Sequence, residues 1–370
     1  MLAFDKHTLT DSPAQITSIF LMPILQSAGV LQQAIITTID IEPLAAMASF
    51  NAQLARLHLT YDKYEAEAPR SLIVKLPAVN TELQQNAAVF RPGLKECWFY
   101  RHGVARTPLN VPYCYYNAVD AATGGSFLLL EDLAPARTGN RINGTSLEEA
   151  KLALQSLAHL HAAWWAVDPA AEQELVQLMD NFQEAQNLVE QLYQDAWPQF
   201  LKRAVFEIPD DIQQFGECLV GRISAAEALL DSSPRTLMHG DFRLENMLFG
   251  TRHGQPICWV IDWEDIMLWN GMFDAAWFLG GCLPVEKSDK EEELLRCYHQ
   301  ALTQAGVEGY PWAQCYHDYR CAMLSSFVQG ILTVASLETD DDYAHNLARV
   351  LAERFIMACR RLRLYELLPS

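Results

Sequence analysis

The stretch LMHGDFRLENMLFGTRHGQPICWVIDWEDI, residues 237–266, decides which fold and which chemistry we expect of this sequence. Two short apolar runs lie on either side of a His-Gly pair at 253–254, which predicts a loop followed by a β-hairpin. Asp241 and Asn246 lie in the predicted loop, and Asp262 ends the second predicted strand. The stretch therefore supplies oxygen-bearing side chains from two chain segments.

These three side chains predict a phosphotransferase site. Transfer of a γ-phosphoryl group needs a carboxylate near the attacking hydroxyl, and oxygen ligands from two segments to hold Mg²⁺. An aspartate in a loop can accept the acceptor's proton, so Asp241 is the candidate catalytic residue. The amide oxygen of Asn246 and the carboxylate of Asp262 are the candidate Mg²⁺ ligands. A His-Gly-Asp tripeptide alone is common in loops, so this interpretation depends on the spacing of all three residues.

The first third of the chain predicts an α+β arrangement. Residues 15–29 have the spacing of a helix, and residues 81–104 suggest a second helix that Pro92 and Gly93 interrupt. Strands are predicted where short apolar runs or alternation occur, at residues 53–62, 71–76, 111–120 and 126–133.

A Gly-, Pro- and Asn-rich stretch at residues 134–145 marks the expected boundary between two domains, 1–133 and 134–370. Directly after it, Ser146 and Glu149 form a capping box that opens a long helical run. Further helices are predicted from three- and four-residue apolar spacing, over much of 171–205, 209–230, 290–305, 312–336 and 342–366. Apart from residues 237–266, the second domain is therefore expected to be mainly helical.

Composition excludes several classes of protein. Of the 370 residues, 50% are hydrophobic and 20% are charged, which is typical of a folded globular chain and not of a disordered or fibrous one. No apolar run is long enough to span a membrane, and the first residues lack the features of a signal peptide. The nine cysteines are scattered and form no C-x-x-C pair, so we expect them to be reduced. We therefore expect a cytoplasmic protein without a membrane partner.

The net charge of −19 argues against nucleic acid or an anionic membrane as the main partner. Up to residue 135 there are 12 acidic and 9 basic residues, so most of the negative charge belongs to the remainder of the chain. An acidic second domain favours a cationic ligand, although charged helix faces in contact with solvent explain the same excess.

The order of motifs resembles the aminoglycoside phosphotransferase and choline kinase superfamily, and in particular its ecdysteroid kinase-like group. The pattern H-G-D-x-x-x-x-N is followed about twenty residues later by I-D-W-E, and then by FDAAWFLGG. Before it, QLARLHLTYD, APRSLIVKLP, KECWFYRHGV, VPYCYYNAV, FLLLEDL and LAHLHAAWW occur in the order found in that group. The resemblance implies a two-lobed protein-kinase-like fold, with a small antiparallel-sheet lobe that binds nucleotide and a larger, mainly helical lobe.

The resemblance also implies a role for individual residues in binding ATP. Lys75 would bind the α and β phosphates, and Glu96 would hold Lys75 by an ion pair. The segment FLLLEDL would be the hinge, with backbone groups of Glu131 and Leu133 near the adenine.

In the second lobe the resemblance assigns the same roles that the chemistry does, with Asp241 as the catalytic base and Asn246 and Asp262 as Mg²⁺ ligands. His239 would brace the catalytic loop, and Asp274 would be structural.

One segment departs from the family pattern. The segment AAMASFNAQ, residues 45–53, would cover the phosphates, yet it has Ala48 and Ser49 where family members often have glycines. Glycine permits the close backbone approach and positive φ that such a loop uses. The alternative hypothesis is therefore a catalytically inactive kinase fold that binds a nucleotide or metabolite.

The acceptor is a small molecule with a hydroxyl group, whose identity the sequence leaves open. The closer resemblance implies a bulky, largely apolar, steroid-like alcohol as acceptor. Candidates to line its pocket are Trp164, Trp165, Trp269, Trp277 and Trp312. Choline or an aminoglycoside is the alternative that the acidic charge favours.

Three residues near these motifs have two interpretations each. Glu264 and Asp265 either contact a ligand or the substrate, or have a solvated or capping role. His161 could contact substrate, but we expect it to be a packed core histidine.

Overall fold

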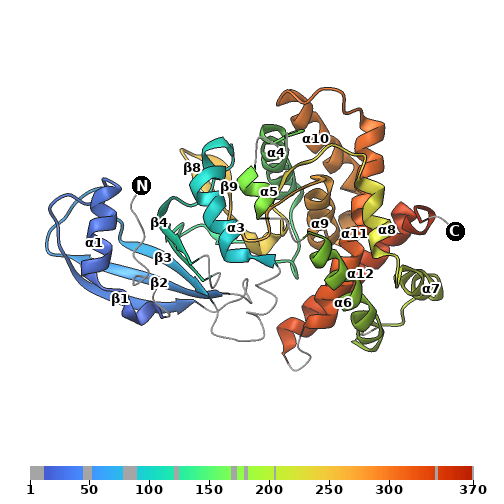
Figure 1. Ribbon diagram of the computed structural model, residues 1–370, viewed down its shortest axis with the longest axis horizontal. Coiled ribbons are helices and arrows are strands. Elements are labelled where there is room, and N and C mark those ends of the chain that lie inside the picture. Colours follow the sequence, from blue (N-terminus) through green and yellow to red (C-terminus); the bar gives the residue numbers. More distant parts are fainter. Residues whose placement is uncertain are drawn as a thin grey trace. The chain divides into compact units, whose positions relative to one another are not determined.

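The computed structural model describes residues 12–44, 52–77, 90–120, 125–167, 173–178, 182–203, 206–337 and 341–368. These residues form two compact units, each with its own arrangement of elements (Figure 1). The first unit contains the described residues up to Ala105, together with Asn110–Arg137 and Trp259–Asp265. The second unit contains the rest. The chain therefore passes between the units more than once, and a short segment after the hairpin returns to the first unit.

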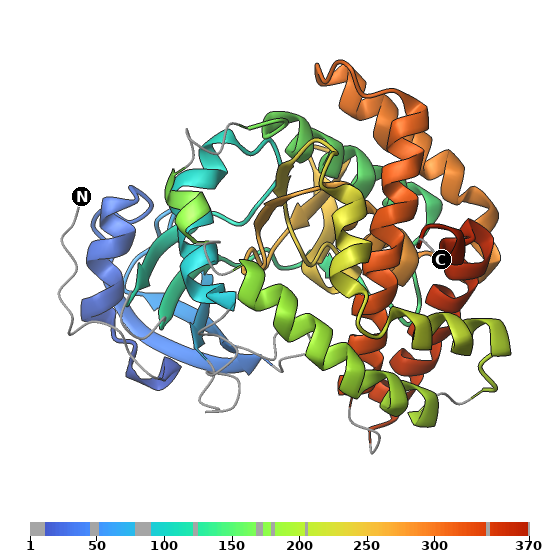
Figure 2. The same ribbon diagram turned by 45° about the vertical axis from the view of Figure 1, so that its right-hand side comes forward.

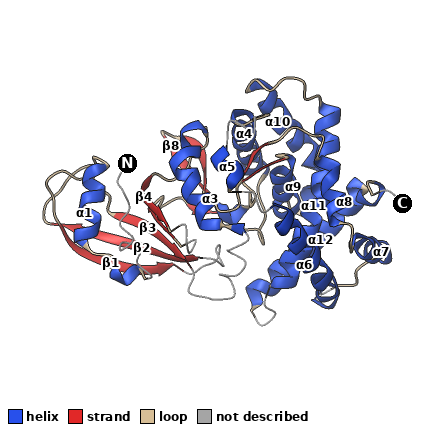
Figure 3. Ribbon diagram, viewed as in Figure 1, coloured by secondary structure: helices blue, strands red, loops and turns tan. Residues whose placement is uncertain are grey.

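The first unit is built on a five-stranded antiparallel sheet with the strand order β1-β2-β3-β5-β4 (Figure 3). Its strands are β1 (Ile36–Leu44), β2 (Ala52–Tyr61), β3 (Ser71–Pro77), β4 (Cys114–Val119) and β5 (Ser126–Glu131). The four strands predicted from the sequence are confirmed. β1 was not predicted, because it is an edge strand in which only Ile36 is buried and no apolar run marks it.

Among the described residues, two helices accompany this sheet. Helix α1 (Ser18–Ser27) begins after Thr17, whose hydroxyl accepts a hydrogen bond from the Phe20 N–H, and it buries Leu21 and Leu25 in the core of the sheet. Helix α3 (Pro92–Trp98) begins at the proline that was expected to interrupt a longer helix, and it continues as a π-helical turn, Phe99–Gly103. The part of that expectation before residue 90 lies outside the described residues.

The second unit is mainly helical, as predicted (Figures 2 and 3). Its helices are α4 (Leu147–Ala163), α5 (Gln173–Gln177), α6 (Phe182–Arg203), α7 (Asp210–Leu219), α8 (Ile223–Glu227), α9 (Met272–Cys282), α10 (Glu291–Gln304), α11 (Trp312–Ser336) and α12 (Asp342–Leu362). The capping box at the start of α4 is present, because the Ser146 hydroxyl accepts a hydrogen bond from the Glu149 N–H at 3.1 Å. The long helix α11 packs against α6, α9 and α12.

Helix α9 was not among the predicted helices. Nearly all of its residues are buried, so its sequence MFDAAWFLGGC is apolar on every face and lacks the amphipathic period that reveals a surface helix. Sequence periodicity alone gave no signal for it.

The predicted loop and hairpin are both present. Strands β8 (Met247–Arg252) and β9 (Gln255–Val260) pair in a sheet of order β6-β8-β9, where β6 is Arg137–Thr138. The turn between them has positive φ at His253 and Gly254, as a type I′ hairpin requires. Before β8, the loop that carries Asp241 leaves β7 (Thr236–Met238), which pairs with β10 (Met267–Trp269).

Among the helices that the structure describes, none has both the length and the apolar character needed to cross a membrane.

Close packing of α9, α11 and α12 around Phe355 generates a test. A Cβ atom on Gly330 would lie 2.4 Å from the Phe355 ring, whereas one on Gly281 would meet its nearest neighbours at 3.8 Å. We therefore expect Gly330→Ala to lower the free energy of unfolding by about 1–3 kcal/mol through overpacking. Gly281→Ala is the matched control, and because alanine favours a helix it should leave stability unchanged or raise it slightly. Equal stability of the two variants in urea unfolding would contradict this packing.

Candidate active site

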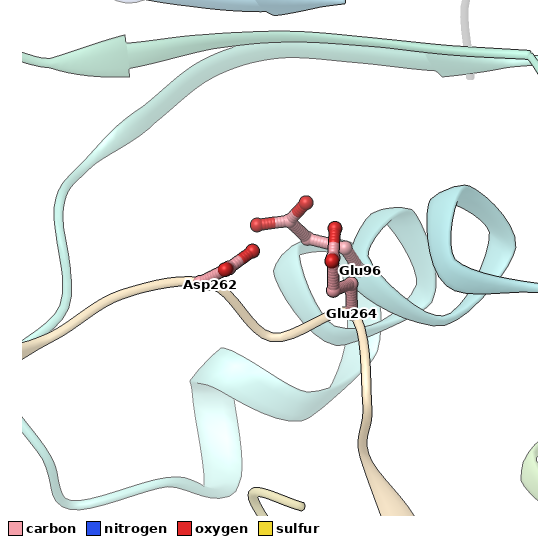
Figure 4. A group of neighbouring side chains, drawn as sticks. All are labelled: Glu96, Asp262 and Glu264. Carbon is pink, nitrogen blue, oxygen red and sulfur yellow. The ribbon is translucent and has the colours of Figure 1, made fainter. Parts of the chain in front are cut away.

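In the first unit, three carboxylates meet around the ammonium of Lys75. Figure 4 shows these carboxylates, which belong to Glu96, Asp262 and Glu264. Lys75 lies in the central strand β3, between the buried residues Val74 and Leu76, and its ammonium lies 2.7 Å from Glu96 of α3. The same ammonium contacts Asp262, and it lies 3.0 Å from Glu264. The ion pair between Lys75 and Glu96 that the resemblance implied is present.

The residue between Asp262 and Glu264 explains why both carboxylates face Lys75. Trp263 is fully buried, and its ring stacks on Phe99 with centroids 3.7 Å apart. Its indole N–H donates to the Val260 carbonyl at 3.2 Å. Asp262 itself has a φ of +66°, a left-handed conformation that aspartate tolerates better than most residues but that still costs free energy. The backbone is thus held in an unfavourable conformation that directs the carboxylates inward.

The charges of this cluster are unbalanced, because three carboxylates surround one ammonium. Burial opposes the charged form of Lys75, but Asp262, Glu264 and Glu96 together raise its pKa well above the usual value. Burial also raises the pKa of Glu96 to about 7, since Asp262 and Glu264 oppose the favourable effect of Lys75. The carboxylate oxygens of Glu96, Asp262 and Glu264 lie within 4.8 Å of one another, close enough to share a cation.

Glu264 is the residue of this cluster that the sequence left undecided. Its side chain is only 12% exposed and pairs with Lys75, so the interpretation of a solvated carboxylate is wrong. Its place two residues after Asp262, across a tryptophan that must be buried, was the available signal.

In the second unit, the loop after β7 presents the carboxylate of Asp241. One carboxylate oxygen, Oδ2, accepts hydrogen bonds from Arg243 Nε at 2.6 Å and from Asn246 Nδ2 at 2.9 Å. The other, Oδ1, accepts one from Trp277 Nε1 at 3.0 Å. Burial alone would raise the pKa of Asp241, but the charges and hydrogen bonds of Arg243, Arg141 and Trp277 lower it to about 2. Asp241 is therefore a carboxylate at every physiological pH.

A second buried carboxylate holds the backbone of this loop. Asp274 is fully buried at the start of α9, and it accepts hydrogen bonds from the N–H groups of His239 at 2.6 Å and Gly240 at 2.8 Å. Gly240 has a φ of +87°, which suits glycine and few other residues. The His239 ring accepts a hydrogen bond from the Asp241 N–H at 3.2 Å. The expectations that His239 braces the loop and that Asp274 is structural are confirmed.

His161 also belongs to this support. It is fully buried, with one ring nitrogen 2.7 Å from the Tyr298 hydroxyl and the other 3.2 Å from Asp274. The prediction of a packed core histidine is confirmed.

The side chain of Asn246 offers a ligand atom. Its amide nitrogen donates to Asp241, which assigns the other amide atom as oxygen, and that oxygen is buried without a hydrogen-bond partner among the described residues. A buried amide oxygen with no donor is costly unless something else satisfies it. A cation would do so, and oxygen is the ligand atom that Mg²⁺ prefers.

Two arginines near Asp241 were not singled out from the sequence. Arg243 pairs with Asp241 and lies 3.4 Å from Glu245, and Glu245 also pairs with Arg141 at 2.8 Å. The signal for Arg243 was its place two residues after Asp241. In an extended backbone, such as that at Arg243, side chains two residues apart share one side of the chain. Arg141 lies in the predicted boundary stretch, where no pattern marked it.

The hinge candidates lie at the end of β5 in the first unit. Glu131 uses its N–H to bond the Tyr113 carbonyl at 2.8 Å, and its side chain accepts from the Tyr113 N–H at 3.0 Å. For the N–H of Leu133, no hydrogen bond occurs within the described part of the chain. The expected phosphate loop, with Ala48 and Ser49, falls in residues 45–51, outside the described residues.

Comparison with known proteins finds a family that matches the sequence and solved structures that share the fold. The model of the ecdysteroid kinase-like family matches residues 47–307. An ethanolamine kinase of Plasmodium vivax shares the fold with a TM-score of 0.52 at 12% identity, covering 91% of this chain and 87% of that chain. An aminoglycoside 2′-phosphotransferase-IIIa, solved as its GDP complex, has a TM-score of 0.52 at 11% identity, covering 92% and 99%. No curated protein matches the sequence. The fold is therefore kinase-like.

Replacing Lys75 by Met tests the charge balance of the first cluster. At about pH 8 in metal-free buffer, we expect the free energy of unfolding to fall by about 3–5 kcal/mol, since three carboxylates lose the ammonium that pairs with all of them. The pKa of Glu96 is raised from the value of 4.5 that we take for the unfolded chain to about 7, so this group contributes its full stabilisation below about pH 4.5. That contribution is lost as the pH rises through about 7. Because removing Lys75 raises that pKa further, the variant should lose less stability at about pH 5 than at about pH 8.

The matched control for this experiment is Lys63→Met, which removes an exposed ammonium from the same unit. Urea unfolding at both pH values would contradict the account if Lys75→Met lost no more stability than Lys63→Met, or lost the same amount at both pH values.

Proposed function

Because the chain belongs to the ecdysteroid kinase-like family, we propose that it transfers the γ-phosphoryl group of ATP to a hydroxyl group of a small molecule. The observation that carries this proposal is the pairing of Asp241 with Asn246. The first is a carboxylate held by three donors, and the second presents a buried amide oxygen without a partner. An orienting acceptor and a metal ligand side by side are what phosphoryl transfer requires of a protein.

In this proposal Asp241 orients the acceptor hydroxyl and takes its proton late. A carboxylate with a pKa of about 2 is a weak base, so it gains little from early proton abstraction. Phosphoryl transfer passes through a loose transition state in which the attacking oxygen forms little bond, so positioning matters more than basicity. Asp241 meets that need, because hydrogen bonds on both of its oxygens fix the carboxylate plane.

Asn246 and Asp262 would hold Mg²⁺. The donor set fits, since both residues offer oxygen, the Asn246 oxygen has no hydrogen-bond partner, and the three carboxylates around Lys75 exceed the positive charge there. When bound, Mg²⁺ offsets negative charge on the transferring phosphoryl group. That the two residues, which belong to different units, serve one nucleotide is part of the proposal.

Lys75 would bind the α and β phosphates, with Glu96 as its anchor. Lys75 is suited to this because its raised pKa keeps it charged at any working pH. The N–H of Leu133 would donate to the adenine, and the Glu131 backbone would lie beside it. Glu131 is compatible with this role because its own N–H is already bonded within the sheet.

A bulky apolar alcohol is our proposed acceptor. The indole of Trp277 donates a hydrogen bond to Asp241, and the half-buried Phe273 of the same helix stacks parallel to that indole, with ring centroids 6.5 Å apart. An aromatic surface beside the base favours a flat, apolar substrate. Trp164 is less suited, because the Arg106 guanidinium already covers its ring. Cationic alcohols such as choline and aminoglycosides are the alternative.

Asp241→Asn is the variant that tests this function. With MgATP or MgGTP and a panel of steroid alcohols, choline and aminoglycosides, wild-type protein should yield a product heavier by one phosphoryl group. We expect the variant to lose transfer by about a thousandfold or more, since the acceptor loses its orienting carboxylate. Asp231→Asn, an exposed aspartate of the same unit, should retain wild-type turnover. Undiminished transfer in Asp241→Asn would sink the assignment.

A further inference from the structure

We propose that Arg141 and Arg243 form a phosphate-binding subsite beside Asp241, which receives the transferred phosphoryl group and holds the phosphomonoester product. The subsite deepens the proposed function and rests on it. Both arginines belong to the second unit, whereas Lys75 belongs to the first. The ligand class of the subsite is a phosphate monoester dianion.

The first observation is the state of Arg141. This residue is only 5% exposed, its N–H donates to Glu245 Oε1 at 3.0 Å, and its carbonyl accepts from Arg354 Nη1 at 2.7 Å. The backbone is therefore fixed, yet the side-chain Nη1 has no hydrogen-bond partner within the described residues. The Nε group lies 2.8 Å from Glu245 Oε2 in an ion pair that is not aligned as a hydrogen bond. Buried donors of a guanidinium are rarely left unpaired without a reason.

The second observation is the way in which Glu245 links the two arginines. Its Oε2 atom lies 2.8 Å from Arg141 Nε and 3.4 Å from Arg243 Nη1. The buried carboxylate of Glu245 thus pairs with both guanidinium groups. It keeps these two like charges close together in a chain of strongly negative net charge. Paired guanidinium forks match the oxygen geometry of phosphate.

The third observation is the distance to the reacting atoms. Arg243 Nε lies 2.6 Å from Asp241 Oδ2. A hydroxyl group that donates a hydrogen bond to Asp241 therefore lies close to the Arg243 guanidinium. Once that hydroxyl oxygen is bonded to phosphorus, the new phosphate group occupies the same neighbourhood. Arg243, which pairs with Asp241, and Arg141, which pairs with Glu245 of the same loop, are then the cations beside it.

The reaction step balances with these residues in place. The acceptor oxygen forms a bond to the γ-phosphorus, and the bond from that phosphorus to the bridging oxygen of the diphosphate breaks, so ADP leaves with the electron pair. The hydroxyl proton passes to Asp241 and then to solvent. The product carries two negative charges beside Asp241, and the two guanidinium groups offset the repulsion between that phosphate and the carboxylate.

A purely structural role makes a different prediction. If Arg141 and Arg243 only fastened the loop through Glu245, their loss would reduce stability and leave the affinity for phosphate unchanged in protein that still folds. A phosphate subsite predicts the loss of an anion-binding event that can be measured without turnover.

The test is a calorimetric titration of inorganic phosphate and phenyl phosphate into wild-type protein, Arg141→Gln and Arg243→Gln. Arg296→Gln is the matched control, because this arginine is exposed on α10, where it pairs with Glu292 and lies over the Trp312 ring. We expect wild-type protein and Arg296→Gln to bind alike, and each subsite variant to bind at least about tenfold more weakly, as the loss of a charge-assisted hydrogen bond implies. Unchanged affinity in the folded subsite variants, or no binding by wild-type protein, would overturn the proposal.

Two further readouts keep the outcome decisive. If a glutamine variant does not fold, Arg141→Lys or Arg243→Lys retains the charge but loses the fork, and the proposal expects weakened phosphate binding there too. In turnover, free guanidinium ion should partly restore transfer by Arg243→Gln, which a structural role does not predict. If phosphate binding depends on the arginines but no alcohol is ever phosphorylated, the subsite stands and the proposed function fails. If alcohols are phosphorylated equally well by the variants, the subsite fails and the proposed function stands.

Discussion

The two hydrogen bonds from the loop backbone to the buried carboxylate of Asp274 are the constraint on which the candidate site depends. They tie His239 and Gly240 to the start of α9, and they require the positive φ that glycine supplies. Asp241 is the next residue, so its position follows from the hydrogen bonds that fix the backbone of His239 and Gly240. Trp277, from the same helix α9, then fixes one oxygen of the Asp241 carboxylate. One helix therefore holds both the loop and the orientation of its reactive group.

The two units share one electrostatic feature. In each unit, a buried cation is surrounded by carboxylates that are held by neighbouring residues: Lys75 by Glu96, Asp262 and Glu264, and the two arginines by Asp241 and Glu245. Such clusters cost free energy to bury, and their retention is better explained by ligand binding than by stability. The excess of carboxylates around Lys75 suits a divalent cation, whereas the arginines suit a phosphate.

The sequence predicted the parts of the structure that leave local patterns. Strands β2 to β5, the capping box at Ser146 and the hairpin after Asn246 all carry short-range signals, and each is present. Ordered motifs further identified Lys75 and Glu96 as partners, although they lie in different elements. The edge strand β1 and the buried helix α9 left no periodic signal, because one is mostly exposed and the other is apolar on every face.

Side-chain networks were predicted less well, because they depend on tertiary contacts between distant segments. Glu264 turns toward Lys75 only because Trp263 is buried against Phe99, which no local pattern reports. Arg141 reaches Glu245 across more than one hundred residues of sequence. The roles of Asp241, Asn246, Asp262, Glu131 and Leu133 remain proposals, which the geometry supports without testing them.

The most direct measurement is a calorimetric titration of ATP and of GTP, each with and without Mg²⁺, into wild-type protein and Asp262→Asn. The account predicts that wild-type protein binds a nucleoside triphosphate only when Mg²⁺ is present, and that Asp262→Asn loses this binding while it remains folded. Binding that is independent of Mg²⁺ and unaffected by the substitution would contradict it. Absence of binding of either nucleotide to folded wild-type protein would also contradict it, and would favour a kinase fold that has lost catalysis.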